Sequence, residues 1–246
     1  MRLNTKAIII KEQTVRESDR LVTLLTADYG IVRAFVRGAK KVNSRFSSST
    51  SLFSYASFSL YRGKDAYIVD DVQPIEVFFK LREHLESLAL AQYFSQLALE
   101  FAEEEANCGE LSRVLLNAFF LLCKGECNYK KIKSVVELRI LSVSGYMPNL
   151  VGCASCGIYE SETMYFDLQG GELRCSVCGP GMRRFVALPL GVVTAMRYIC
   201  LSESKKIFSF HLSDANMELL SRVAEDFLIA RADRRLTALE FYKSLT

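Results

Sequence analysis

The apolar positions in the first third of the chain come in short alternating or β-branched runs. Turn-like stretches around residues 29–30, 43–44 and 62–65 separate these runs. Runs of this length between turn residues are typical of β-strands. The pattern predicts five strands, at residues 5–10, 20–26, 30–36, 52–61 and 66–72. Five short strands in about 75 residues indicate a small β-barrel.

After Pro74 the apolar residues follow the helical period. A long helix is predicted for residues 81–106, and its acidic end is expected to be solvated. Further helices are predicted at residues 112–123, 130–144, 189–201, 214–230 and 236–245. The pattern therefore predicts a barrel domain at residues 1–79 and a helical domain at residues 80–246, interrupted at about 150–186, where neither period holds.

The interruption carries the strongest motif of the sequence, CASCGIYESETMYFDLQGGELRCSVCG. Two Cys-x-x-Cys pairs, Cys153 with Cys156 and Cys175 with Cys178, are separated by 18 residues. This spacing is typical of a four-cysteine zinc site, because each short turn can offer two thiolates to one tetrahedral ion. Four thiolates leave no open coordination position, so the sequence predicts one structural Zn²⁺ per chain. A dithiol redox centre and four incidental cysteines are the alternatives.

Composition limits the class of protein. Half of the residues are hydrophobic, which suits a globular chain, and apolar windows such as residues 114–123 are too short to span a bilayer. The N-terminus lacks the apolar core of a secretory signal, so we expect a cytoplasmic protein without a membrane span. Residues 1–80 contain 13 basic and 8 acidic residues, a net charge of +5, whereas residues 81–150 carry −2 and the remainder is neutral. A local excess of this kind suggests a polyanionic or acidic partner.

The basic excess is concentrated in residues 33–45, which we call the basic segment. It contains no acid and five cations: Arg33, Arg37, Lys40, Lys41 and Arg45. The segment leaves a predicted strand and enters SSSTS at residues 47–51, which is expected to be flexible, so its charges should project from the barrel rim. Barrels can bind single strands with such a basic groove and with aromatic rings that stack on bases. The stacking candidates are Phe35, Phe46, Phe53, Tyr55 and Tyr61. The alternative is that the rings fill the core and the cations are merely solvated.

Candidates for catalysis are few. Neither His84 nor His211 lies in a nucleophile–base motif, and no glycine-rich phosphate loop is present, so no nucleotide cofactor is expected. Asp65, Asp70 and Asp71 could form a two-metal nuclease cluster, but acids that bound a strand are usually turn residues. We therefore do not expect an enzyme.

The segment VRESDRLVTLLTADYGIVRAFVRGAKKVNSR resembles the N-terminal signature of the bacterial DNA repair protein RecO family. In both, an Asp-Arg segment leads into a strand, a Tyr-Gly turn, a second strand and a Gly-Ala-basic-basic turn. CASCG and GGELRCSVCG are similar to the zinc segment of many, though not all, members, and RRLTALEFYKSL resembles the C-terminal helix of the family. The resemblance covers nearly the whole chain, although SSSTS stands where a more apolar or basic loop is expected.

The resemblance implies an α+β fold, in which an N-terminal OB-type five-stranded β-barrel precedes an α-helical domain with an inserted four-cysteine zinc ribbon. It implies a non-enzymatic recombination mediator that binds single- and double-stranded DNA and anneals complementary strands. With RecR, such a protein helps to load RecA on DNA coated by single-strand-binding protein, whose C-terminal tail would dock on the helical domain. A cytoplasmic, nucleoid-associated protein is expected.

The family's DNA contacts carry over to this chain by position. The expected phosphate contacts are Arg37, Lys40, Lys41 and Arg45, and Arg20 is a further candidate that could instead pair with Glu17 or Asp19. A second interpretation is a zinc-ribbon module that serves as a transcription or translation accessory factor, which would prefer RNA or a protein partner.

Overall fold

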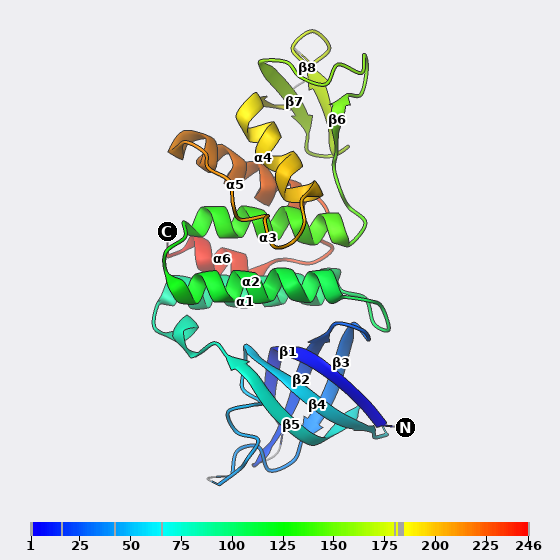
Figure 1. Ribbon diagram of the computed structural model, residues 1–246, viewed down its shortest axis with the longest axis vertical. Helices are drawn as coiled ribbons and strands as arrows, with labels where there is room; N and C mark the ends of the chain where they lie inside the picture. The colour runs from blue at the N-terminus through cyan, green and yellow to red at the C-terminus, as the bar shows by residue number, and fades with distance from the viewer. Residues whose placement is uncertain are drawn as a thin grey trace. The chain divides into compact units, whose positions relative to one another are not determined.

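The computed structural model describes residues 2–15, 17–41, 43–64, 66–179, 181 and 185–245. The chain forms two compact units, Met1–Gly125 with Leu236–Thr246, and Glu126–Arg235. The first unit contains the barrel, and the second contains the cysteine-rich sheet (Figure 1). The domain boundaries expected from the sequence, 1–79 and 80–246, stay a prediction.

Five strands of the first unit close into a barrel. Neighbouring strands follow the order β1-β2-β3-β5-β4, and all pairs are antiparallel except β3 with β5. Alternate side chains such as Ile9, Leu24 and Phe58 fill the interior, as the two-residue period of a strand requires. The predicted OB-type barrel is confirmed. The strands are β1 (Arg2–Val15), β2 (Asp19–Thr26), β3 (Ile31–Val36), β4 (Ser54–Arg62) and β5 (Tyr67–Val77).

Helical elements complete the first unit. Helix α6 packs against α1, where the Gln96 side-chain oxygen accepts a hydrogen bond from the Ala238 backbone N–H at 2.9 Å. Among the residues that the structure describes, no helix is long and apolar enough to cross a bilayer. The elements are the 3₁₀ helix η1 (Phe79–Arg82), α1 (Leu85–Phe101), α2 (Gly109–Lys124) and α6 (Thr237–Lys243).

The acidic end of the long predicted helix is not helical. Helix α1 stops at Phe101, and the next residues run beside the turn at residues 29–30. The Ile31 N–H donates to the Glu103 carbonyl at 3.4 Å, and the Glu105 N–H donates to the Tyr29 carbonyl at 3.2 Å. Gly30 permits this approach because a side chain there would meet the Glu103 carbonyl oxygen at 1.9 Å. Backbone pairing with a distant turn therefore replaces the last helical turn.

The second unit combines three helices with a small sheet. The side chains of Asn128 and Ser213 cap α3 and α5. Each accepts hydrogen bonds from backbone N–H groups of the first helical turn that have no partner within the helix. The helices are α3 (Tyr129–Val143), α4 (Leu190–Leu201) and α5 (Asp214–Ile229). The sheet has the order β6-β8-β7-β9 and consists of β6 (Asn149–Cys153), β7 (Thr163–Asp167), β8 (Glu172–Cys175) and β9 (Phe185–Pro189).

A buried ion triad joins α3 to α5. The Lys133 ammonium lies 2.8 Å from a carboxylate oxygen of Glu137 and 2.8 Å from one of Glu225. Burial alone would lower the pKa of Lys133, but the two carboxylates outweigh it, so the pKa is raised. Lys133 therefore stays charged inside the unit.

Candidate nucleic-acid interface and metal centre

The four predicted metal ligands meet at one end of the small sheet. The Sγ atoms of Cys153, Cys156, Cys175 and Cys178 all lie within 4.8 Å of one another, and those of Cys156 and Cys175 are 3.7 Å apart. A tetrahedral ion with Zn–S bonds of about 2.3 Å sets its sulfurs about 3.8 Å apart. Among the described residues, this is the one cluster of side chains found that could hold a metal ion.

Backbone N–H groups favour ionised sulfur at this cluster. Burial opposes charge on the Cys153 thiol, yet hydrogen bonds from the backbone of Cys156, Cys175 and Ser155 outweigh it and lower the pKa to about 6. Hydrogen bonding to the Cys175 sulfur raises the pKa of Cys178 to about 12. Thiols this close do not all ionise unaided, so four thiolates here require a cation.

Two arginines that no sequence motif indicates attach the sheet to the helices of the second unit. Arg197 of α4 donates to the carbonyls of Leu150 and Tyr159, both at 2.7 Å, and its guanidinium lies 3.9 Å from the centre of the Tyr159 ring. Arg231 donates to the carbonyls of residues 168–169 at 3.0 and 3.1 Å. A lone arginine within the apolar run GVVTAMRYICL was the available signal for Arg197.

The predicted phosphate contacts share one exposed loop between β3 and β4. Arg37, Lys40, Lys41 and Arg45 are all exposed. Within the described part of the chain, no ion pair engages Arg37, Lys40 or Lys41. The Arg45 guanidinium lies 3.8 Å from an Asp71 carboxylate oxygen, but the Arg45 side chain is 73% exposed. The loop thus presents three cations without an acidic partner among the described residues, and a fourth, Arg45, that stays largely exposed beside Asp71.

The basic segment is fixed to the barrel at residues 38–40. The Gly38 N–H donates to the Asp19 side chain at 2.8 Å, and the Lys40 N–H donates to the Ser18 carbonyl at 3.0 Å. Between them, the side chain of Ala39 is fully buried in the barrel core. Asp19 is therefore engaged by the loop backbone, whereas the carboxylate found beside Arg20 is that of Glu12.

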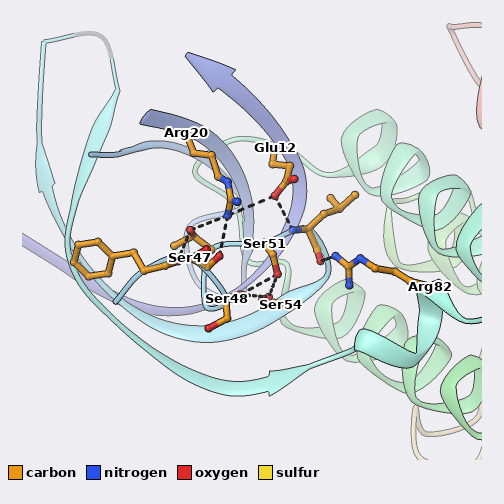
Figure 2. Close-up of polar contacts among 10 residues, drawn as sticks. Glu12, Arg20, Ser47, Ser48, Ser51, Ser54 and Arg82 are labelled. Carbon is orange, nitrogen blue, oxygen red and sulfur yellow. Dashed lines mark hydrogen bonds and ion pairs between the residues drawn. The ribbon is translucent and has the colours of Figure 1, made fainter. Parts of the chain in front are cut away.

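Residues 46–54, which we call the serine loop, are compact and hydrogen-bonded (Figure 2). Thr50 donates through its hydroxyl to the Phe46 carbonyl at 2.6 Å, and Ser51 and Ser54 both donate to the Ser48 carbonyl. The hydroxyl groups of Thr50, Ser51 and Ser54 satisfy backbone acceptors of the same loop, while the flexibility expected for this stretch stays a prediction.

Charged side chains from three other elements hold the serine loop (Figure 2). Arg20 of β2 donates through one nitrogen to the Ser47 carbonyl at 2.9 Å and to the Thr50 hydroxyl at 3.3 Å. Its guanidinium also lies 3.9 Å from a Glu12 carboxylate oxygen, and its side chain is only 14% exposed. The predicted phosphate contact of Arg20 stays a prediction, whereas its engagement with the loop is observed.

Leu52 of the serine loop is held through both of its backbone groups. Its N–H donates to the Glu12 side chain of β1 at 2.9 Å, and its carbonyl accepts from Arg82 of η1 at 2.9 Å. No sequence motif contains Glu12 or Arg82, and their partners lie 40 and 30 positions away along the chain.

The aromatic candidates for base stacking differ in exposure. Phe53 is excluded, because it is fully buried with its ring centroid 5.4 Å from that of Phe119. Phe46 packs against the barrel core and lies 4.6 Å below the Arg45 guanidinium. Phe46 and the other three rings are partly exposed and stay candidates: Phe35, Phe46, Tyr55 and Tyr61.

The acids of the nuclease alternative have arginine partners. Asp70 lies 3.4 Å from the Arg2 guanidinium and Asp71 lies 3.8 Å from that of Arg45. Asp65, the third acid of that alternative, lies outside the described residues. The two described carboxylates therefore have a structural explanation at the surface of β5.

Comparison with known proteins decides the family. Residues 1–78 match the family described as Recombination protein O N terminal, and residues 82–240 match Recombination protein O C terminal. The chain belongs to the RecO family. The resemblance to RecO that the sequence motifs indicate is thereby confirmed.

Individual RecO proteins align along the chain. DNA repair protein RecO of Acetivibrio thermocellus is 30% identical over 243 residues, which cover 99% of this chain and 97% of that protein. The RecO protein of Alkaliphilus metalliredigens is 27% identical over 248 residues and covers all of both chains. That of Clostridium novyi is 33% identical over 174 residues, 71% of this chain and 68% of its own. The stretch that aligns with the first two relatives therefore spans the barrel, the cysteine-rich segment and the helices.

Proposed function

We propose that this chain is a non-enzymatic, DNA-binding recombination mediator that anneals complementary strands. Its membership of the RecO family supports a role in recombinational DNA repair. In this proposal residues 1–79 form the DNA-binding OB-fold domain, and residues 80–246 form the helical domain. The protein acts in the cytoplasm, at the nucleoid.

One observation carries the proposal of DNA binding. The loop between β3 and β4 is fixed to the barrel at both ends and exposes four cations: Arg37, Lys40, Lys41 and Arg45. Cations on an ordered loop can neutralise phosphates and release their counterions, which drives binding to single- and double-stranded DNA. Contacts with the phosphate backbone carry little sequence information, so a weak sequence preference is expected.

Annealing follows from the same electrostatics. Two DNA strands repel each other through their phosphates, and a basic surface that neutralises both lowers this barrier. Because the cations contact the backbone, the bases remain free to test their pairing. The protein needs no nucleotide cofactor for this process.

We infer that the cysteine cluster holds one Zn²⁺ per chain in a structural role. The separation of the sulfurs suits a tetrahedral ion, and four thiolates leave no position for water or substrate. The ion would order residues 150–186, a segment with a small apolar core of its own.

Three protein partners belong to the proposal because the family suggests them. RecR would act together with this chain, and RecA would be loaded on the DNA. The C-terminal tail of single-strand-binding protein, which is acidic and apolar, would dock in a groove between helices.

The test of DNA binding is fluorescence anisotropy of a labelled single strand across a salt series. Each phosphate contact should contribute about −0.7 to the slope of log affinity against log salt. A variant that lacks all four loop cations should lose about three units of slope and should anneal complementary strands slowly. It carries Arg37→Ala, Lys40→Ala, Lys41→Ala and Arg45→Ala. The matched control removes four exposed cations elsewhere: Lys6, Lys80, Arg113 and Lys124.

The outcomes separate the candidate functions. Retention of the full slope by the folded, zinc-loaded loop variant would refute the proposed interface. Tighter binding of the wild type to RNA of the same sequence would instead favour a transcription or translation accessory factor.

A further inference from the structure

Both ends of the β3–β4 loop are fastened by charged side chains of the barrel wall. Asp19 accepts the Gly38 N–H at the start of the loop, and the adjacent Arg20 donates to the Ser47 carbonyl. Near the end, Glu12 accepts the Leu52 N–H. Hydrogen bonds with an ionised partner are stronger than neutral ones, so these few contacts can fix the backbone of a polar loop.

The end of the serine loop has a conformation that a free chain would avoid. Phe53 adopts φ +66°, a left-handed backbone conformation that is unfavourable for any residue with a side chain. Burial of its ring against Phe119 and a 2.9 Å hydrogen bond from its N–H to the Ile9 carbonyl maintain this conformation. The neighbouring Leu52 is the residue that Glu12 and Arg82 hold (Figure 2). The loop is therefore anchored at a strained point.

Three cations of the proposed interface, Lys40, Lys41 and Arg45, lie between these fastened points, and Arg37 directly precedes the first of them. Lys40 and Lys41 follow Gly38 and the buried Ala39, and Arg45 directly precedes the serine loop and lies over the Phe46 ring. An ordered loop presents its cations without further cost, whereas a mobile loop loses conformational entropy when it binds. Contacts that order the loop therefore raise affinity without touching the ligand.

We propose that Glu12 and Arg20 are positioning residues for nucleic-acid binding, which hold the serine loop so that the basic segment is preorganised. This inference rests on the proposed function. It assigns a supporting role to a carboxylate on a basic surface, and it reassigns Arg20 from a phosphate contact to an anchor of the loop.

The charge of Glu12 makes the inference testable, because two explanations predict opposite signs. If Glu12 acted only as a charge, it would repel phosphate, and any neutral replacement would tighten binding. If Glu12 positions the loop, a replacement that cannot accept the Leu52 N–H must weaken binding. Glutamine removes the charge but keeps a carbonyl oxygen in place, so it separates the two effects.

The experiment compares Glu12→Ala, Glu12→Gln and Glu17→Ala by anisotropy with labelled single-stranded DNA. Glu17 is an exposed acid in the turn between β1 and β2, next to Ser18, whose carbonyl accepts the Lys40 N–H, and it serves as the control for charge. We expect Glu12→Ala to bind about fivefold more weakly than the wild type, the effect of one lost hydrogen bond. Glu12→Gln and Glu17→Ala should bind as tightly as the wild type or more tightly. The salt slope of Glu12→Ala should change by less than about 0.7, because every loop cation remains.

A second variant avoids any change of charge. Thr50→Val removes the hydroxyl that accepts from Arg20 and donates to the Phe46 carbonyl, at a fully buried position. It should also weaken DNA binding severalfold with an unchanged salt slope. Circular dichroism and zinc content establish that each variant is folded.

Three results would overturn the inference. Tightening by Glu12→Ala equal to that by Glu12→Gln would show that Glu12 acts only as a charge. A salt slope for Glu12→Ala that is smaller than that of the wild type by about 0.7 or more would show that a phosphate contact is lost. The effect would then not be a higher cost of ordering the loop. Failure of the wild type to bind DNA would remove the proposed function as well, whereas the first two results leave it intact.

Discussion

Gly30 is the position at which one methyl group should do the most damage to the first unit. Its φ is +59°, and an added Cβ would lie 1.9 Å from the Glu103 carbonyl oxygen. Because the obstructing atom belongs to the backbone, no side-chain rotation can relieve the overlap. Gly30→Ala must therefore push the segment after α1 away from the turn at residues 29–30.

The expected loss follows from the contacts that would be broken. The left-handed conformation costs a residue with a side chain about 1 kcal/mol. Separation of the two segments would break the hydrogen bonds from Ile31 to Glu103 and from Glu105 to Tyr29, each worth about 1 kcal/mol. Gly30→Ala should thus lower the free energy of unfolding by about 3 kcal/mol.

Gly125 provides a matched control in the same unit. Its φ is +68°, but an added Cβ would meet no atom within 4 Å. Gly125→Ala should therefore cost only the conformational term, about 1 kcal/mol. Urea denaturation followed by circular dichroism, with zinc present throughout, measures both losses. Equal losses for the two variants would refute the close approach of the turn to residues 103–105.

Three further predictions concern the second unit. Removal of zinc with a chelator should lower its melting temperature, and Cys156→Ser should bind zinc more weakly, as metal analysis after dialysis would show. Lys133→Ala strands the carboxylates of Glu137 and Glu225 and should cost about 3 to 5 kcal/mol of stability at neutral pH. Because the pKa of Lys133 is raised above its ordinary value of 10.5, thermal unfolding should show a constant deficit from neutral pH up to that value, which shrinks as the pH rises through the folded-state pKa. Arg197→Ala should free residues 150–160 from α4, because the hydrogen bonds to the carbonyls of Leu150 and Tyr159 are lost. Arg197→Lys should not restore them, since one ammonium group cannot replace the planar guanidinium, so limited proteolysis should cut both variants faster near residues 150–160.

Local spacing made the metal centre and the barrel predictable. Each Cys-x-x-Cys turn is complete within four residues, so the sequence contained both halves of the cluster before the fold joined them. The barrel strands were visible because one face of each is apolar. The cations of the basic segment could also be predicted, because the charge of each side chain follows from the residue type alone.

Contacts between distant residues could not be predicted in this way. Glu12 and Arg20 hold residues that lie 40 and 27 positions away, and nothing in their own neighbourhoods indicates those partners. The helix predicted for residues 81–106 ends early for the same reason, since its acidic end pairs with a turn more than 70 residues before it. A run of serines suggests flexibility until the acceptors that its hydroxyl groups satisfy are known.

The adjacent residues Asp19 and Arg20 have a consequence for the exchange of loops between family members. Successive side chains of a strand point to opposite faces, and here one fastens Gly38 while the other fastens Ser47. A loop grafted from a relative would inherit the charges it carries but would lose both fasteners unless this dipeptide moved with it. The transferable module is thus the loop together with Asp19 and Arg20 of β2. Chimaeras that receive the loop without these two residues should carry its charges on a loop that is no longer fastened.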